Sequence, residues 1–233
     1  MILRLEDVNS GYGKSLCCIG IDIEIHEGER VCVLGRNGVG KTTLLKTIMG
    51  ILPAYSGRCL LNGKDVIRMA SYLIARLGVG YVPQGREIFG AFSVKDNLRL
   101  GTVAGSGRVG DIDENIFDYF PILRERYLQR AGTLSGGEQQ MLSIARALVG
   151  KPKILLLDEP SEGIQPNIVD RLREIIKQIS VTQRIAVLLV EQNLEFALDI
   201  TDRGYVMEKG SIVEEGTTEK LKEDTVVKAY LGV

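Results

Sequence analysis

The segment GRNGVGKT, residues 35–42, constrains the fold more than any other part of the chain. It matches the pattern G-x-x-x-x-G-K-[ST], and at ordinary residue frequencies a chance match in a chain of 233 residues is roughly a one-per-cent event. The apolar run RVCVLG precedes it, as in a strand buried on both faces, and the helix-like segment KTTLLKTIMG follows. A strand, a glycine-rich loop and a helix in this order predict a loop that binds phosphate through backbone N–H groups.

We predict that this loop binds a nucleoside triphosphate. Backbone N–H groups up to Thr42 would face the β-phosphate, Lys41 would reach the β- and γ-phosphate oxygens, and the Thr42 hydroxyl would bind Mg²⁺. The predicted phosphate-binding residues are Gly35, Arg36, Asn37, Gly38, Val39, Gly40, Lys41, Thr42 and Thr43.

Two adjacent acidic residues, Asp158 and Glu159, end the apolar run of ILLLDEP. Acids at the carboxyl end of a buried strand are costly unless a cation lies beside them. We predict that Asp158 holds Mg²⁺ and that Glu159 is the general base for the attacking water. A solvated turn with two acids is the alternative, and the phosphate loop disfavours it.

Two further residues are candidates for the same site. Gln84 follows the strand-like segment VGYVP, and its amide oxygen could reach Mg²⁺ or the attacking water. An ordinary loop glutamine is the alternative. Tyr12 lies between two glycines in NSGYGK and could stack on adenine, although a surface tyrosine in a turn is nearly as good an interpretation.

The pattern along the chain predicts an α/β protein with an inserted helical lobe. Alternating segments near the N-terminus favour strands with one wet face, and KILLLDEP, a helix at about 167–180 and IAVLLVEQ favour a parallel sheet. Between these parts, strand-like runs stop. We therefore expect one domain in which residues 1–85 and 151–233 form the nucleotide-binding core with an antiparallel β subdomain, and residues 86–150 form the helical lobe.

A second glycine-opened helix is predicted in LSGGEQQMLSIARAL, residues 134–148. Met141, Ile144, Ala145 and Leu148 give it one apolar face. Its first residues, Ser135, Gly136, Gly137 and Glu138, would offer a hydroxyl and free backbone N–H groups to phosphate. A serine cap with Glu138 in the first turn explains part of this pattern. Because one phosphate cannot easily use two helix ends in different lobes, we expect this end to serve a nucleotide bound by a partner molecule.

Composition excludes several other functions. Net charge is −1, with no basic field suited to nucleic acid. Cysteines at 17, 18, 32 and 59 form no metal-binding pattern with the single histidine, so we expect reduced thiols. The start of the sequence has no signal-peptide pattern, and the longest apolar runs are far shorter than a membrane span. Any membrane association would depend on another polypeptide.

The residues 35–43, Gln84, LSGGEQQ and ILLLDEP, in this order and spacing, resemble the ATP-binding subunit of an ABC transporter. The resemblance covers essentially the whole chain. It implies a P-loop NTPase core, ATP and Mg²⁺ as ligands, and a head-to-tail pair of ATPase subunits enclosing two ATP molecules. It further implies two transmembrane permease subunits, indirect action with an extracytoplasmic solute-binding protein, and a peripheral location at the cytoplasmic face of the inner membrane.

A finer resemblance is to importers of branched-chain amino acids and of urea, with homodimer and heterodimer both open. The segments GRNGVGKTTLLK, YVPQGREIFG and DEPSEGIQP look more like the urea type. Gln192 stands where most members have a histidine that contacts the γ-phosphate, so a catalytic role is implied for it. Gln165 replaces an aspartate common in the wider family. The alternatives are a soluble ABC-type ATPase acting in nucleic-acid repair or translation, and a catalytically inactive regulatory subunit.

Overall fold

A computed structural model describes residues 1–223, apart from the side chain of residue 106. Its centre is a six-stranded sheet in the order β10-β9-β3-β8-β7-β6. Five neighbouring strands are parallel: β6 (Val79–Val82), β7 (Ile154–Asp158), β8 (Ala186–Glu191), β3 (Arg30–Leu34) and β9 (Arg203–Glu208). The edge strand β10 (Ser211–Thr217) pairs antiparallel with β9. The buried apolar runs of β3, β7 and β8 suit strands covered on both faces.

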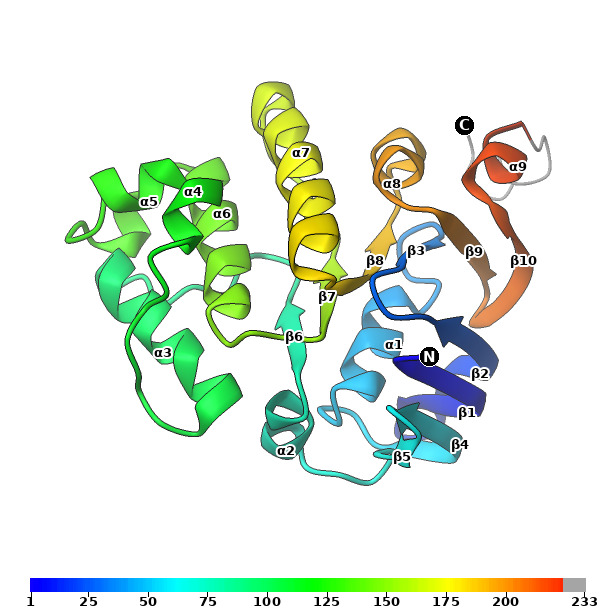
Figure 1. The fold of residues 1–233 in the computed structure, drawn as a ribbon. Coiled ribbons are helices and arrows are strands. Elements are labelled where there is room, and N and C mark those ends of the chain that lie inside the picture. Colours follow the sequence, from blue (N-terminus) through cyan, green and yellow to red (C-terminus); the bar gives the residue numbers. More distant parts are fainter. Residues whose placement is uncertain (224–233) are drawn as a thin grey trace.

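A second sheet is antiparallel and has the order β2-β1-β4-β5. Its strands are β1 (Leu3–Tyr12), β2 (Ser15–Ile25), β4 (Ala54–Leu61) and β5 (Lys64–Asp65). Helix α1 (Lys41–Ile48) lies between the two sheets, and its residues share one apolar core with both (Figure 1). The predicted fold class, a P-loop-type α/β core with an antiparallel β part, is confirmed.

Helices occupy the stretch between β6 and β7. They are α3 (Val94–Ser106), α4 (Ile116–Tyr119), α5 (Pro121–Glu125), the short 3₁₀ helix η1 (Ala131–Thr133) and α6 (Gly136–Leu148). Figure 1 draws them in green beside the sheet core, and they share a second apolar core with α7 (Pro166–Gln183) and α8 (Leu194–Ile200). Helix α2 (Ser71–Arg76) precedes β6, and α9 (Thr218–Glu223) follows β10. The division into residues 1–85, 86–150 and 151–233 stays a prediction, and its residues 224–233 lie outside the described part.

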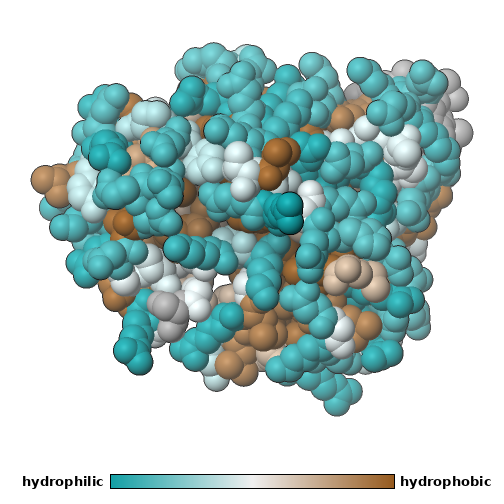
Figure 2. Space-filling model, viewed as in Figure 1, coloured by the Kyte–Doolittle hydropathy of each residue, from teal (hydrophilic) through white to brown (hydrophobic). Residues whose placement is uncertain are grey.

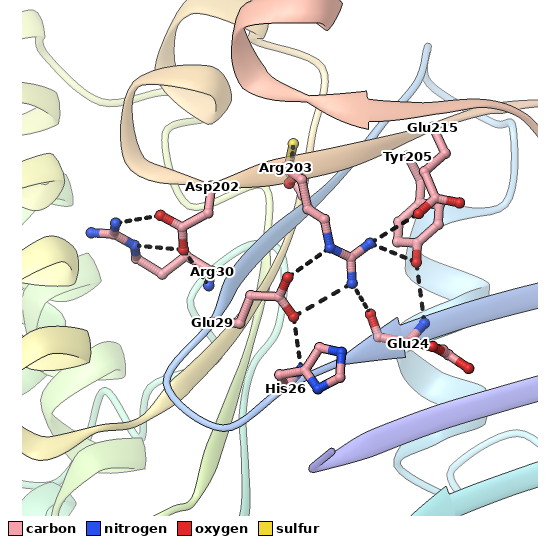
Figure 3. A network of polar contacts seen from close by, with 9 residues as sticks. Glu24, His26, Glu29, Arg30, Asp202, Arg203, Tyr205 and Glu215 are labelled. Carbon is pink, nitrogen blue, oxygen red and sulfur yellow. Dashed lines mark hydrogen bonds and ion pairs between the residues drawn. The ribbon is translucent and has the colours of Figure 1, made fainter.

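Arg203 joins the two sheets through one polar network (Figure 3). Its guanidinium pairs with Glu29 at 2.6 Å, donates to the Tyr205 hydroxyl at 2.7 Å, and donates to the backbone carbonyl of Glu24 on β2. A partly buried arginine with several acceptors is held in one geometry, because its planar fork has fixed donor directions. This network lies at the end of β3 that is farther from residues 35–42.

The described surface is largely polar. Figure 2 shows one face covered mainly by hydrophilic side chains, with an apolar area around α2. Within residues 1–223, no helix has the length and apolar character needed to cross a membrane. The four cysteines are free thiols.

Candidate active site

The loop after β3 forms a cradle of backbone groups above the N-terminus of α1. Gly40 has a φ of 118°, and a Cβ there would come 2.2 Å from the Cys17 carbonyl oxygen. Gly38 also has a left-handed φ, of 81°, but its missing Cβ would meet nothing. Gly40 is therefore required by both its backbone conformation and close packing, and Gly38 by its backbone conformation alone. A cavity of about 320 Å³ lies over this loop.

Residues from four parts of the sequence line this cavity. The lining residues are Cys17, Asn37, Gly38, Gly40, Lys41, Thr42, Thr43, Gln84 and Glu159. The structure thus brings most of the predicted phosphate loop together with Gln84 and Glu159. Arg36 is exposed and Gly35 is buried, and neither lines the cavity.

Lys41 is buried and has an acceptor for each of its three N–H donors. Its Nζ donates to the Gly35 carbonyl at 2.7 Å and to the Arg36 carbonyl at 3.0 Å, and it pairs with Glu159 Oε1 at 2.9 Å. A bound phosphate could be contacted only if one of these interactions is given up. The loop therefore holds Lys41 directly beside the predicted base.

Asp158 ends β7 with both carboxylate oxygens hydrogen-bonded. Thr42 Oγ1 donates to Oδ1 at 3.0 Å, and the Tyr81 hydroxyl donates to Oδ2 at 3.3 Å. Burial raises the pKa of Asp158, and the hydrogen bond from Thr42 opposes that shift. Burial, together with the nearby Asp158 charge, likewise raises the pKa of Tyr81 above its ordinary value. The cost of ionising this buried carboxyl group would fall if a cation were bound beside it.

Gln84 lies between two carboxylates. Its Nε2 donates to Glu159 Oε2 at 3.2 Å and to Glu162 Oε2 at 2.9 Å. The two glutamates thus fix the orientation of the Gln84 amide group. Gln84 lines the phosphate cavity, and its contact with Mg²⁺ or the attacking water stays a prediction.

Tyr12 is the last residue of β1 and is half exposed. It does not line the cavity over the phosphate loop. The turn after it is fixed from β4, because the Tyr55 hydroxyl donates to the Gly13 carbonyl at 2.9 Å. The ring is accessible for stacking, and the predicted adenine contact stays a prediction.

The start of α6 lies apart from this cavity, since residues 135–138 do not line it. Ser135 and Glu138 form a reciprocal cap: the Glu138 amide donates to Ser135 Oγ at 3.3 Å, and the Ser135 amide donates to Glu138 Oε2 at 2.7 Å. A Cβ on Gly137 would come 2.8 Å from the Ile168 side chain of α7. Helix packing therefore accounts for Gly137, and ligand approach is not its only explanation. Ser135 itself is exposed.

Gln192 is exposed just after β8 and does not reach the phosphate cavity. It lines a different cavity, of about 950 Å³, together with Arg173, Asn193 and residues of α8 and α9. The catalytic role implied for Gln192 stays a prediction. Gln165, also exposed, precedes α7 as its N-cap residue.

Comparisons with known proteins decide the family. The family model described as ABC transporter matches residues 18–162. The chain is 42% identical over 238 aligned positions to the high-affinity branched-chain amino acid transport ATP-binding protein BraG of Pseudomonas aeruginosa, covering 99% of this chain and all of BraG.

The chain belongs to the ABC transporter family. It is 35% identical to the probable branched-chain amino acid transport ATP-binding protein LivF of Archaeoglobus fulgidus, with 95% of this chain and 94% of that protein covered. The solved ADP conformation of MJ1267, an ATP-binding cassette of an ABC transporter, matches with a TM-score of 0.87 at 26% identity, over 100% of this chain and 99% of that one. The predicted ATP-binding transporter subunit is confirmed, and the chain is an ATPase.

Some residues of this ABC ATPase site were missed from the sequence. Tyr81 sits in the strand segment VGYVP as a typical strand aromatic, and no local pattern indicates that its hydroxyl reaches Asp158. Glu191 reads as a polar residue at the end of IAVLLVE, yet its carboxylate is buried and accepts from Ser161. Both contacts depend on strand order in the sheet, which sequence spacing does not reveal.

Proposed function

We propose that this ABC ATPase is the motor subunit of an importer for a small polar solute, hydrolysing ATP with Glu159 as general base. The observation that carries this proposal is the meeting of Lys41 and Glu159 at one cavity above a glycine loop, where Thr42 of the same cavity is hydrogen-bonded to Asp158. The loop would bind phosphate, and Glu159 Oε1 would turn from Lys41 to the attacking water once the lysine engages phosphate. Such a base typically contributes about 10²- to 10⁴-fold in rate.

The donor set around Asp158 fits Mg²⁺. Thr42 Oγ1 and Asp158 Oδ1 lie 3.0 Å apart, close enough to share one small cation, and Gln84 adds an amide. Mg²⁺ prefers oxygen ligands and usually completes its shell with water and substrate phosphates. We propose that Thr42, Asp158 and Gln84 hold it, where it would neutralise charge on the phosphates.

Turnover requires a second ATPase subunit in this proposal. Residues 135–138 do not line the cavity over the phosphate loop, and Ser135 at the start of α6 is exposed. Members of the ABC transporter family act as pairs of ATPase subunits with transmembrane permeases. We propose a head-to-tail pair in which Ser135 and Gly136 of one subunit contact the γ-phosphate held by the other. The partner is a second copy or a related subunit.

We propose that branched-chain amino acids are the solute, because BraG and LivF carry that description. Urea is the second candidate, favoured by DEPSEGIQP and YVPQGREIFG in this sequence. In either case we place the protein at the cytoplasmic face of the membrane, bound to permease subunits, with no nucleic-acid partner.

The experiment that tests this function is ATP hydrolysis by the complete transporter in proteoliposomes. Hydrolysis should increase when its solute-binding protein is loaded with leucine, and the Glu159→Gln complex should show no increase. Stimulation by urea alone would move the assignment to the second candidate. A wild-type rate that is the same with and without loaded binding protein would contradict the importer proposal.

A further inference from the structure

Glu191 is a buried carboxylate beside the active site to which the proposed function gives no role. It ends β8 opposite Leu34 of β3, and it is 2% exposed. Within residues 1–223 it forms no ion pair. Burying a charge without a cation is costly. The side chain therefore needs an explanation beyond packing.

Four donors converge on the Glu191 carboxylate. Oε1 accepts from the Ser161 hydroxyl at 2.6 Å and from the Ser161 amide at 3.1 Å. Oε2 accepts from the backbone amides of Gln192 at 3.1 Å and Asn193 at 3.2 Å. An ionised carboxylate accepts all four, whereas an amide in its place would set its own N–H groups against the backbone donors on one side.

The segment held through Ser161 carries the proposed base in an unfavourable conformation. Glu159 has a φ of 46°, a left-handed backbone conformation that residues other than glycine usually avoid. Such a conformation persists only where surrounding contacts fix it. Two contacts do so from consecutive residues of β8: the Glu159 amide donates to the Val190 carbonyl at 2.9 Å, and Glu191 holds Ser161 two residues later.

We propose that Glu191 is a positioning residue for ATP hydrolysis: through Ser161 it holds the left-handed turn that directs Glu159 into the phosphate cavity. The inference rests on the proposed role of Glu159 as the base. The other carboxylate oxygen fixes the chain where it leaves β8, at Gln192 and Asn193. One side chain thus sets the relative placement of two loops beside the nucleotide site.

The test combines two conservative variants. Glu191→Gln keeps the size of the side chain but turns an NH₂ group toward one pair of donors. Ser161→Ala removes the hydroxyl contact and leaves the backbone contact. Because small displacements of a catalytic group can cost about 10²-fold in rate, we expect kcat to fall roughly 10- to 100-fold in Glu191→Gln and less in Ser161→Ala. The ATP dissociation constant should stay within about twofold, since the hydrogen bonds of both side chains go to residues outside 35–43.

The double variant separates positioning from a general loss of structure. If Glu191 acts by holding Ser161, Glu191→Gln should cost less in a Ser161→Ala background than in the wild type. Independent effects, with the two fold-losses multiplying, would overturn the proposal. So would an unchanged kcat in Glu191→Gln, or an equal loss of ATP affinity and kcat. If Glu191→Gln does not fold, an unchanged kcat in Ser161→Ala would by itself overturn it.

Glu29→Gln is the matched control. Glu29 is also a largely buried carboxylate, paired with Arg203 and accepting from the His26 amide at 2.7 Å, at the far end of β3 (Figure 3). It should lower the Tm and leave kcat within about twofold of wild type. Glu159→Gln distinguishes failure of the inference from failure of the function. If Glu159→Gln hydrolyses ATP normally, the proposed function fails. If it is inactive, but the losses of kcat in Glu191→Gln and Ser161→Ala multiply in the double variant, only the role of Glu191 fails.

Discussion

Lys41 Nζ and Glu159 Oε1 lie 2.9 Å apart, and the two side chains are only 3% and 8% exposed. The residue proposed to bind phosphate thus neutralises the residue proposed to activate water. ATP would compete with Glu159 for Lys41, because the other donors of Lys41 are bonded to the loop carbonyls of Gly35 and Arg36. Phosphate binding and release of the base are therefore coupled in this arrangement.

The pair should also contribute to stability. Removing one member of a buried ion pair leaves the other charge uncompensated, at a cost of about 3 kcal/mol. We expect Lys41→Met, which keeps the aliphatic stem, to lower the free energy of unfolding by that order and to abolish ATP binding. Lys41→Met/Glu159→Gln should recover most of the stability but no binding. Urea unfolding and nucleotide titration measure both quantities, and a double variant no more stable than Lys41→Met would refute the coupling.

Releasing Lys41 should favour nucleotide binding and subunit pairing. Glu159→Gln removes the competing charge. We expect it to bind ATP at least as tightly as the wild type and to leave the bound ATP unhydrolysed. Its solution mass, measured with and without Mg-ATP, should shift from monomer to dimer if this chain supplies both halves. An ATP-bound monomer would instead indicate a distinct sibling subunit as the partner.

Asp158 should make stability depend on pH in a defined direction. Its folded-state pKa is raised, chiefly by burial, so the ionised group opposes folding at neutral pH. That penalty is full above the folded pKa and diminishes as pH falls toward the unfolded value. Asp158→Asn is expected to have a higher Tm than the wild type at neutral pH. In this variant the Thr42 and Tyr81 hydroxyls can still bond to the amide.

The difference in Tm should shrink as the pH is lowered, in protein without nucleotide. Glu191, whose pKa burial also raises, remains in both proteins and cancels in the comparison. A difference that widens toward acid would contradict the direction of the Asp158 shift. Asp158→Asn should also require more Mg²⁺ for half-maximal hydrolysis.

Ser135→Arg tests whether α6 serves a partner's nucleotide. Ser135 is exposed and outside the phosphate cavity of its own chain, so folding and ATP binding by the monomer should be nearly unchanged. Losing the helix cap costs about 1 kcal/mol, which the melting curve will record. In the Glu159→Gln background, Ser135→Arg should block ATP-dependent pairing, whereas Gln178→Arg, at an exposed position of α7, should not. Pairing equal to that of Glu159→Gln alone would argue against the trans contact.

Much of this site follows from local sequence, and the rest from topology. The glycine loop and the Asp-Glu pair at the end of β7 can each be recognised from a few adjacent residues. That the two lie close together follows because parallel strands end at the same edge of the sheet. The bond from Tyr81 to Asp158 requires knowing that β6 lies next to β7, although 77 positions separate the two residues. The buried role of Glu191 requires the order of β7 and β8 in the sheet.

The segments at the ends of α6 and β8 illustrate a different limit. Gly137 looks like a ligand-binding glycine in sequence, yet it also avoids Ile168 of a helix that begins 29 positions later, at Pro166 (166 − 137 = 29). Gln192 follows a strand that ends at the site, but its side chain faces the cavity near α8. Side-chain direction after a strand depends on the next helix, which sequence patterns place only approximately.

The most direct test of the account is the rate of phosphate release at saturating Mg-ATP for wild type, Glu159→Gln and Glu162→Gln. Both glutamates accept a hydrogen bond from Gln84, but only Glu159 pairs with Lys41 in the cavity. We predict a loss of about 10²- to 10⁴-fold for Glu159→Gln and a rate near wild type for Glu162→Gln. Wild-type turnover by Glu159→Gln, or an equal loss in Glu162→Gln, would contradict the assignment of Glu159 as the base.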